Sequence, residues 1–194
     1  MNAAERRLRW STVPQPSQLR FITLKQNQSV KGDGDDLSIY FYQLDHEDGW
    51  ICHNAIGEPV SGERLAPFVV DYQAEYFVCL TVRGMGDTNS ADVAQRVHEE
   101  VLSEVHTPDT RIRYGDPLPD GSLMVGVCFD DLLVVHNTLT AAPHDEQPLK
   151  TAHEAYAQVG LETAPGKGFK GAQNFAARGA LCEGRAGRLG MPLA

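Results

Sequence analysis

Apolar residues recur at two different periods along the chain, and these periods predict its secondary structure. Between residues 88 and 105, five small or branched apolar residues recur at steps of three and four, the period of an amphipathic helix. They are Ala91, Ala94, Val97, Val101 and Val105. We therefore expect a helix over 88–105 whose apolar face packs against a sheet, with His98 and Glu99 on its more exposed side.

Short apolar runs predict the strands. Residues 75–82 read EYFVCLTV and are expected to form a buried strand. Two further runs, 123–128 and 132–135, flank the tripeptide Phe-Asp-Asp, which favours a β-hairpin with acidic residues at its tip. A β-prone run at 19–22 predicts one more short strand.

A second helix is expected over residues 149–159, because Gly160 supplies a stop signal directly after it. The segment 28–35 interrupts the pattern. It reads QSVKGDGD, and its polar residues and glycines are depleted in strands, so we predict a flexible loop there. The order of strands and helices favours an α+β fold, an antiparallel sheet with helices packed on one face.

Composition narrows the class of protein. A chain of 194 residues with 42% hydrophobic and 22% charged residues is typical of a soluble globular domain with a core. It contains no apolar run of the roughly 20 residues that span a membrane, and its start does not resemble a secretory signal. The four cysteines are scattered, which favours neither structural zinc nor a disulfide framework. We expect an intracellular protein, cytoplasmic or nuclear, without membrane contact.

The net charge of −9 argues against simple nucleic-acid binding, but the charge is unevenly distributed. Residues 1–31 carry six Lys or Arg against one acid, and residues 148–194 carry six against three. Residues 32–147 carry five against 22. Basic flanks around an acidic centre suit a protein that binds phosphates at its edges and divalent metal in its middle. A solvated acidic surface with basic ends is the alternative.

The most distinctive local feature is the pair Asp130-Asp131 between two apolar runs. Adjacent carboxylates in apolar surroundings are unfavourable to desolvate unless a cation compensates them. Mg²⁺ prefers such oxygen ligands. The alternative is a solvated turn, because Asp is a common turn residue.

Residues 127–135 resemble the Y-x-D-D hairpin of reverse transcriptases, with Cys128 in the place of the tyrosine. Upstream, residues 36–42 resemble the first carboxylate motif of that family. The resemblance implies that Asp36 joins Asp130 and Asp131 as a metal ligand. It also implies that Phe41 is an aromatic gate against the ribose 2′-hydroxyl.

Four further segments resemble the same family in the same order. Residues 83–95 are similar to the segment that leads into the palm helix, with Gly86 and Gln95 at matching spacing. Residues 155–161, followed by 165–168, are similar to the fourth motif, whose lysine is Lys167 here. The resemblance implies that Lys167 donates a proton to pyrophosphate or neutralises it. Residues 174–181 are similar to the strand turn that follows this motif. Before them all, residues 12–27 are similar to the fingers segment in which Arg20 lies near the incoming triphosphate.

The resemblance covers roughly residues 10–190 and implies a polymerase palm-like fold with partial fingers. Residues 1–35 are expected to form an N-terminal arm and partial fingers, and residues 36–194 the palm, without a thumb. The implied activity is RNA-directed DNA polymerisation by two-metal phosphoryl transfer. It would use Mg²⁺, deoxynucleotide triphosphates and an RNA or DNA template-primer.

Two alternatives stay open from the sequence. One is a catalytically dead palm fragment of a retroelement, such as a retrotransposon, that binds nucleic acid or a partner protein. The other is an unrelated acidic α+β domain. The most useful single observation is the distance between the carboxylates of Asp36 and Asp130. A two-metal site requires these groups close together, because its metals lie only ~4 Å apart.

Overall fold

The computed structural model describes residues 12–87 and 89–190. Within them, contacts divide the chain into a larger unit, residues 12–40 and 92–190, and a smaller unit, residues 41–87 and 89–91. Strands and helices mix in an α+β fold with antiparallel sheets, which confirms the expected fold class. None of the described helices is long and apolar enough to cross a membrane.

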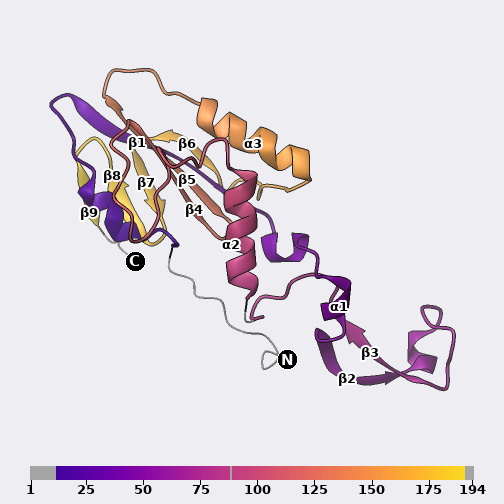
Figure 1. Ribbon diagram of the computed structural model, residues 1–194. Helices are drawn as coiled ribbons and strands as arrows, with labels where there is room; N and C mark the ends of the chain where they lie inside the picture. The colour runs from indigo at the N-terminus through magenta and orange to yellow at the C-terminus, as the bar shows by residue number, and fades with distance from the viewer. Residues whose placement is uncertain (1–11, 88, 191–194) are drawn as a thin grey trace. The chain divides into compact units, whose positions relative to one another are not determined.

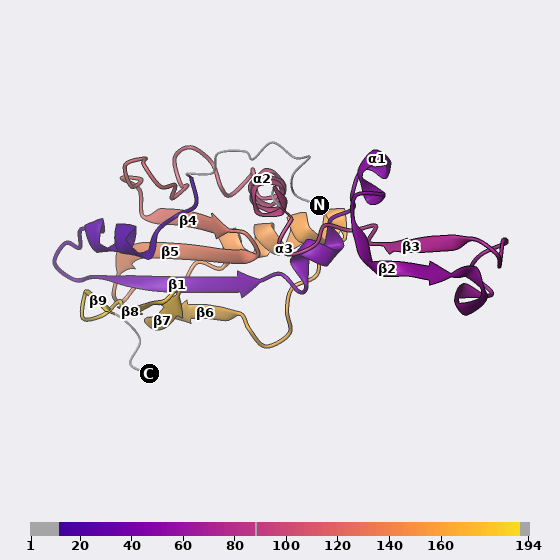
Figure 2. The same ribbon diagram turned by 90° about the horizontal axis from the view of Figure 1, so that it is seen from below.

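The larger unit is built on a four-stranded antiparallel sheet of order β4-β5-β1-β6 (Figures 1 and 2). Its strands are β1 (Gln28–Asp36), β4 (Leu123–Cys128), β5 (Asp131–Leu139) and β6 (Phe169–Ala172). A second sheet contains β7 (Asn174–Ala177), β8 (Ala180–Glu183) and β9 (Arg188–Gly190). The helical elements are η2 (Pro16–Phe21), α3 (Gln147–Val159) and most of α2 (Ser90–Val101).

Strand β1 overturns the prediction of a flexible loop over 28–35. It is an interior strand of the sheet, paired with β5 over its whole length and with β6 on its other side. Its charged side chains at Lys31, Asp33 and Asp35 are buried or half-buried because each has a hydrogen-bond partner, as burial requires. Lys31 Nζ donates to the carbonyl of Ala142 at 2.6 Å, and the carboxylates of Asp33 and Asp35 accept hydrogen bonds from histidines.

The glycines of β1 lie on the opposite face of the strand, where aromatic rings take the space of side chains. A Cβ at Gly32 would lie 2.6 Å from the ring of Phe175, and one at Gly34 would meet the ring of Phe169. The two rings stack with centroids 5.4 Å apart. Glycine is therefore required for this close packing, and it does not mark a loop here.

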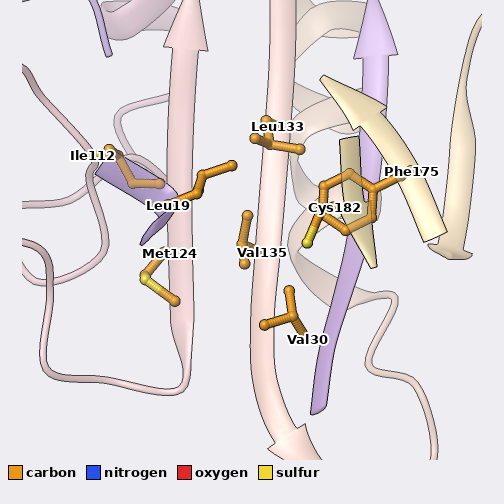
Figure 3. Packing of buried hydrophobic residues seen from close by; sticks show 8 residues of the cluster. All are labelled: Leu19, Val30, Ile112, Met124, Leu133, Val135, Phe175 and Cys182. Carbon is orange, nitrogen blue, oxygen red and sulfur yellow. The ribbon is translucent and has the colours of Figure 1, made fainter. Parts of the chain in front are cut away.

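The main core cluster lies on the glycine face of β1. Val30, Leu133 and Val135 share this face through the antiparallel register of β1 and β5. They pack with residues from β4, η2, β7, β8 and the segment before β4 (Figure 3). Those residues are Leu19, Ile112, Met124, Phe175 and Cys182.

Helix α2 exists as expected, but it buries a different face. Residue 88 lies outside the described residues, and the helix runs from Ser90 to Val101. Its most buried positions include Ala94, Gln95 and His98, whereas Val97 is only half-buried. The prediction that His98 is exposed was wrong, because hydrogen bonds to the β4–β5 hairpin and to α3 satisfy its ring.

Of the predicted strand at 19–22 and the predicted helix at 149–159, only the helix is present. The expected strand at 19–22 is wrong: η2 covers most of it as a 3-10 helix, with Pro16 at the first position, where its missing N–H is harmless. The expected second helix is confirmed as α3, which ends at Gly160 in the left-handed conformation (φ 73°). The expected domain boundary between residues 35 and 36 falls inside β1, and the assignment to fingers and palm stays a prediction.

The smaller unit contains a two-stranded antiparallel sheet of β2 (Ala55–Ser61) and β3 (Glu75–Cys79). Short helical elements accompany it: η3 (Tyr40–Gln43), which begins in the larger unit, α1 (Asp48–Ile51) and η4 (Gly62–Leu65). Strand β3 lies within the expected run 75–82, but its burial was predicted wrongly, since Phe77 is 60% exposed.

Candidate metal and nucleotide site

Three aspartates lie close together along the backbone where β1 ends and β5 begins. Asp36, the last residue of β1, is the antiparallel partner of Asp131, the first residue of β5. Asp130 precedes it in the turn from β4, and its carbonyl accepts a hydrogen bond from Leu37 N at 2.9 Å. Directly opposed antiparallel residues have Cα atoms about 4.5–5.5 Å apart. The expected hairpin is thus present, and it brings the three aspartates together.

The turn itself has a special backbone. Cys128 pairs with Asp131, so only Phe129 and Asp130 connect β4 to β5. Phe129 has a φ of 53°, the positive value that tight two-residue hairpins require at their first position. This conformation is unfavourable for a bulky residue and needs support from its surroundings.

That support comes from the polar face of α2. Phe129 N donates to Gln95 Oε1 at 2.6 Å, and Gln95 Nε2 donates to the carbonyl of Val127 at 2.8 Å. His98 Nδ1 donates to the carbonyl of Phe129, which leaves His98 Nε2 to accept from the Tyr156 hydroxyl at 2.7 Å. Burial lowers the pKa of His98 to about 4, so the ring is neutral and serves as one donor and one acceptor.

Electrostatics at the hairpin favour a cation. Burial raises the pKa of Asp130, and the nearby charge of Asp36 raises it as well. Burial also raises the pKa of Asp131, followed by the charge of Asp130. Half-buried carboxylates that repel one another are compensated best by a divalent ion with oxygen preference. The donor set therefore fits Mg²⁺.

Lys167 lies beside Asp36. Its Nζ donates to Asp36 Oδ1 at 2.9 Å, and this hydrogen bond raises the pKa of the ammonium group. The segment that carries it is tied to β1, because Ala164 N donates to the carbonyl of Asp36 at 2.7 Å. The lysine side chain is 63% exposed and can move toward a ligand.

An open pocket adjoins the carboxylates on the glycine face of β1. Its lining includes Asp36, Asp131, Lys167, Phe169 and Arg178. Asp35 also lines it, so the pocket combines three acidic residues, two cationic residues and an aromatic ring. Carboxylates can hold metal there, and the cationic groups can bind phosphate oxygens.

Arg178 is the residue of this pocket that sequence reasoning missed. It occupies the two-residue turn between β7 and β8, with a φ of 53°. Burial lowers its pKa, whereas Cys128 and Asp131 raise it, so the guanidinium lies in the field of the hairpin. Its Nε and Nη2 atoms are buried without a hydrogen-bond partner. The family resemblance covers its segment, residues 174–181, as a strand turn, but nothing in the sequence connects Arg178 itself to Asp131.

The four residues expected to contact the nucleotide lie in different parts of the structure. Gln95 is fully buried beneath the hairpin, where it braces the turn. Arg20 lies in η2 with its guanidinium 4.7 Å from the ring of Phe21, and it lines a separate pocket together with Leu24. Phe41 and Gly86 belong to the smaller unit. Nucleotide contact by these four residues stays a prediction.

Comparison with known proteins supports the fold. No family model matches the sequence, and no curated protein matches it. Among solved structures, a foamy viral protease-reverse transcriptase in complex with double-stranded DNA is similar over 88% of this chain and 24% of its own, with a TM-score of 0.56 and 13% identity. The foamy viral protease-reverse transcriptase in complex with an RNA/DNA hybrid is similar over 88% of this chain and 18% of its own, with a TM-score of 0.55 and 14% identity.

At these identities the likeness concerns the fold alone. The chain spans about a quarter or less of the length of these proteins. It is therefore similar in fold to a region of a retroviral reverse transcriptase, and the nucleic acids belong to those complexes.

Proposed function

We propose that the larger unit is the palm of a reverse transcriptase-like polymerase. In this proposal it adds deoxynucleotides to a primer on an RNA or DNA template, with Mg²⁺ held by Asp36, Asp130 and Asp131. The observation that carries the proposal is the register of β1 and β5, which opposes Asp36 to Asp131 directly. The fold similarity to a region of reverse transcriptases agrees with it.

The chemistry requires little covalent help from the protein. Phosphoryl transfer depends on positioning and on neutralisation of charge. When bound, Mg²⁺ supplies Lewis acidity that activates the primer 3′-hydroxyl and stabilises the leaving pyrophosphate. Asp36 and Asp131 would hold it from the ends of two paired strands, and Asp130 from the tight turn beside them. Placement on strands fixes the separation of two ligands more firmly than placement on a loop.

The other groups act on phosphate and on the hairpin. Lys167 neutralises the leaving pyrophosphate or donates a proton to it, and the guanidinium of Arg178, which lines the pocket, binds phosphate oxygens. Gln95 and His98 keep the Asp130 turn in its positive-φ conformation. Arg20, Phe41 and Gly86, and Gln95 in a second role, remain proposed nucleotide contacts.

Primer extension on an RNA template tests the proposal. We expect slow extension that requires Mg²⁺ and disappears in Asp130→Ala. Asp109→Asn is the matched control, since it alters an exposed aspartate outside the pocket lining and should extend like the wild type. Equal background from wild type and Asp130→Ala would contradict polymerisation.

A non-catalytic palm that binds nucleic acid or a partner protein is the second candidate. The observation that favours it is the hydrogen bond from Lys167 Nζ to the carboxylate of Asp36. The lysine occupies an oxygen that a catalytic metal would need as a ligand. In that case, template-primer binding measured by fluorescence anisotropy persists in both wild type and Asp130→Ala, while neither extends the primer.

A further inference from the structure

A second group of candidate ligands lies on the other face of β1. Asp33 is fully buried, and its carboxylate accepts hydrogen bonds from two imidazoles. His136 Nε2 donates to Asp33 Oδ2 at 2.9 Å, and His144 Nε2 donates to Asp33 Oδ1 at 2.8 Å. Gly171 N also donates to Oδ1, at 2.7 Å.

This group is distinct from the carboxylates of the hairpin. Side chains alternate between the faces of a strand, so Asp33 and Asp36 point to opposite faces of the sheet. Asp33, His136 and His144 come from β1, from β5 and from the segment between β5 and α3. The three residues contribute nothing to the pocket beside Asp36.

The ligand atoms lie close enough to share one ion. One atom from each of Asp33, His136 and His144 lies within 4.8 Å of the others. In a tetrahedral zinc site with bonds of about 2.0–2.1 Å, neighbouring ligand atoms are about 3.3 Å apart. The two imidazoles lie 2.9 and 2.8 Å from different oxygens of Asp33. When one of these oxygens and both nitrogens bind an ion, the hydrogen-bonded N···O distance to that oxygen opens by about half an ångström, and the other imidazole is already within 4.8 Å.

We propose that Asp33, His136 and His144 form a Zn²⁺ site that links β1, β5 and the segment before α3. Two imidazoles and one carboxylate suit Zn²⁺, whereas Mg²⁺ prefers oxygen ligands alone. The scattered cysteines of the sequence say nothing against such a site, because it uses none of them. The same three ligand types also bind Fe²⁺ in oxygenases, but those sites need several open positions, which the burial of Asp33 and His136 denies.

The surroundings set the expected strength and geometry. The side chain of His144 is 17% exposed, so water can reach that edge and complete a tetrahedral shell. Zinc-bound histidines usually donate their second ring nitrogen to an acceptor, which fixes the ring. His144 Nδ1 is buried without such a partner. We therefore expect a weaker site than one with a complete outer shell.

Titration of the full chain with Co²⁺, which reports tetrahedral sites by visible absorption, tests the proposal. It is done in excess Mg²⁺, so that the hairpin carboxylates are already compensated. We expect one Co²⁺ per chain, displaced by Zn²⁺, and at least a tenfold loss of affinity in His144→Gln. His153→Gln is the matched control, since His153 pairs with the single carboxylate of Asp35.

X-ray absorption of the zinc-loaded wild type keeps the test independent of how the variants fold. We expect a first shell of nitrogen and oxygen only, with no sulfur from the free cysteines. Absence of Co²⁺ binding, equal binding by His144→Gln and the wild type, or a sulfur-containing shell would overturn the proposal. The first of these outcomes would identify the group as a hydrogen-bonded cluster.

Discussion

Lys167 Nζ lies 2.9 Å from Asp36 Oδ1, so an ammonium group is hydrogen-bonded to one oxygen of a carboxylate that we propose as a metal ligand. The lysine is exposed, and nothing in its hydrogen bonding prevents it from moving to a phosphate. Its charge competes with Mg²⁺ for Asp36 while it also compensates Asp130 and Asp131. Metal affinity and catalysis should therefore respond to its removal in opposite directions.

In Lys167→Ala we expect Mg²⁺ to bind severalfold more tightly, because the competing cation is gone. Single-nucleotide incorporation should become at least tenfold slower, since the charge on the leaving pyrophosphate is no longer neutralised. Calorimetric Mg²⁺ titration and rapid-quench incorporation measure the two effects. Lys170→Ala changes an exposed lysine on β6 and should alter neither. Weaker Mg²⁺ binding in Lys167→Ala would contradict the competition.

Asp131→Asn should stabilise the metal-free protein. The pKa of Asp131 is raised in the folded state, so the folded chain loses stability as the pH rises through that pKa, and the charge is unfavourable at neutral pH. Removing it should add roughly 1 kcal/mol, or about 2–4 °C in melting temperature. Differential scanning calorimetry without divalent ions measures this, with Asp109→Asn unchanged. Mg²⁺ should raise the melting temperature of the wild type and have little effect on the variant.

Gln95→Leu tests the brace beneath the hairpin. It removes the partners of the Phe129 N–H and the Val127 carbonyl, and each unpaired buried group costs about 1–3 kcal/mol. We expect a loss of about 2–4 kcal/mol in the free energy of unfolding, measured in urea. Arg96→Leu changes an exposed neighbour on the same helix and should stay within about 0.5 kcal/mol of the wild type. Comparable losses in both variants would show that α2 itself, rather than the brace, was damaged.

Stability should fall in mild acid because of two buried histidines. Burial lowers the pKa of His98 and of His106 to about 4, against an ordinary value of 6.5. The unfolded chain therefore binds more protons between pH 6.5 and 4, so folding stability declines as the pH falls through that window. By pH 4, each histidine lowers the free energy of unfolding by up to about 3 kcal/mol. Urea midpoints at pH 7 and pH 4.5 measure the decline, and equal midpoints would mean that these rings titrate normally.

The sequence predicts the hairpin and α3 well because their signals are local. Apolar runs flank Asp130 and Asp131 directly, and Gly160 stops α3 one residue after its end. Strand β1 carries the opposite local signal, since its polar residues and glycines are typical of loops. The imidazoles on β5, on α3 and on the segment between them, the carbonyl of Ala142, and the rings on β6 and β7 make it a buried strand.

The site shows the same limit. Only the family resemblance brought Asp36 and Lys167 together as candidate site residues, because they lie 131 positions apart in the sequence although they form an ion pair. Arg178 and the buried face of α2 were not predictable. Apolar periodicity assigned Val97 and Val101 to the core, but tertiary hydrogen bonds bury Gln95 and His98. Long-range polar partners are invisible to a pattern of hydrophobic residues.

Direct measurement of divalent metal at the hairpin tests the central claim. Mn²⁺ replaces Mg²⁺ in many sites, and its binding can be followed by electron paramagnetic resonance. It is titrated into the wild type, into Asp131→Asn and into His144→Gln. The last variant distinguishes binding at the hairpin from binding at the proposed zinc site. We predict that the wild type and His144→Gln bind Mn²⁺ equally, that Mg²⁺ displaces it, and that Asp131→Asn binds at least tenfold more weakly. Equal Mn²⁺ affinity in Asp131→Asn and the wild type would contradict a metal site at Asp36, Asp130 and Asp131.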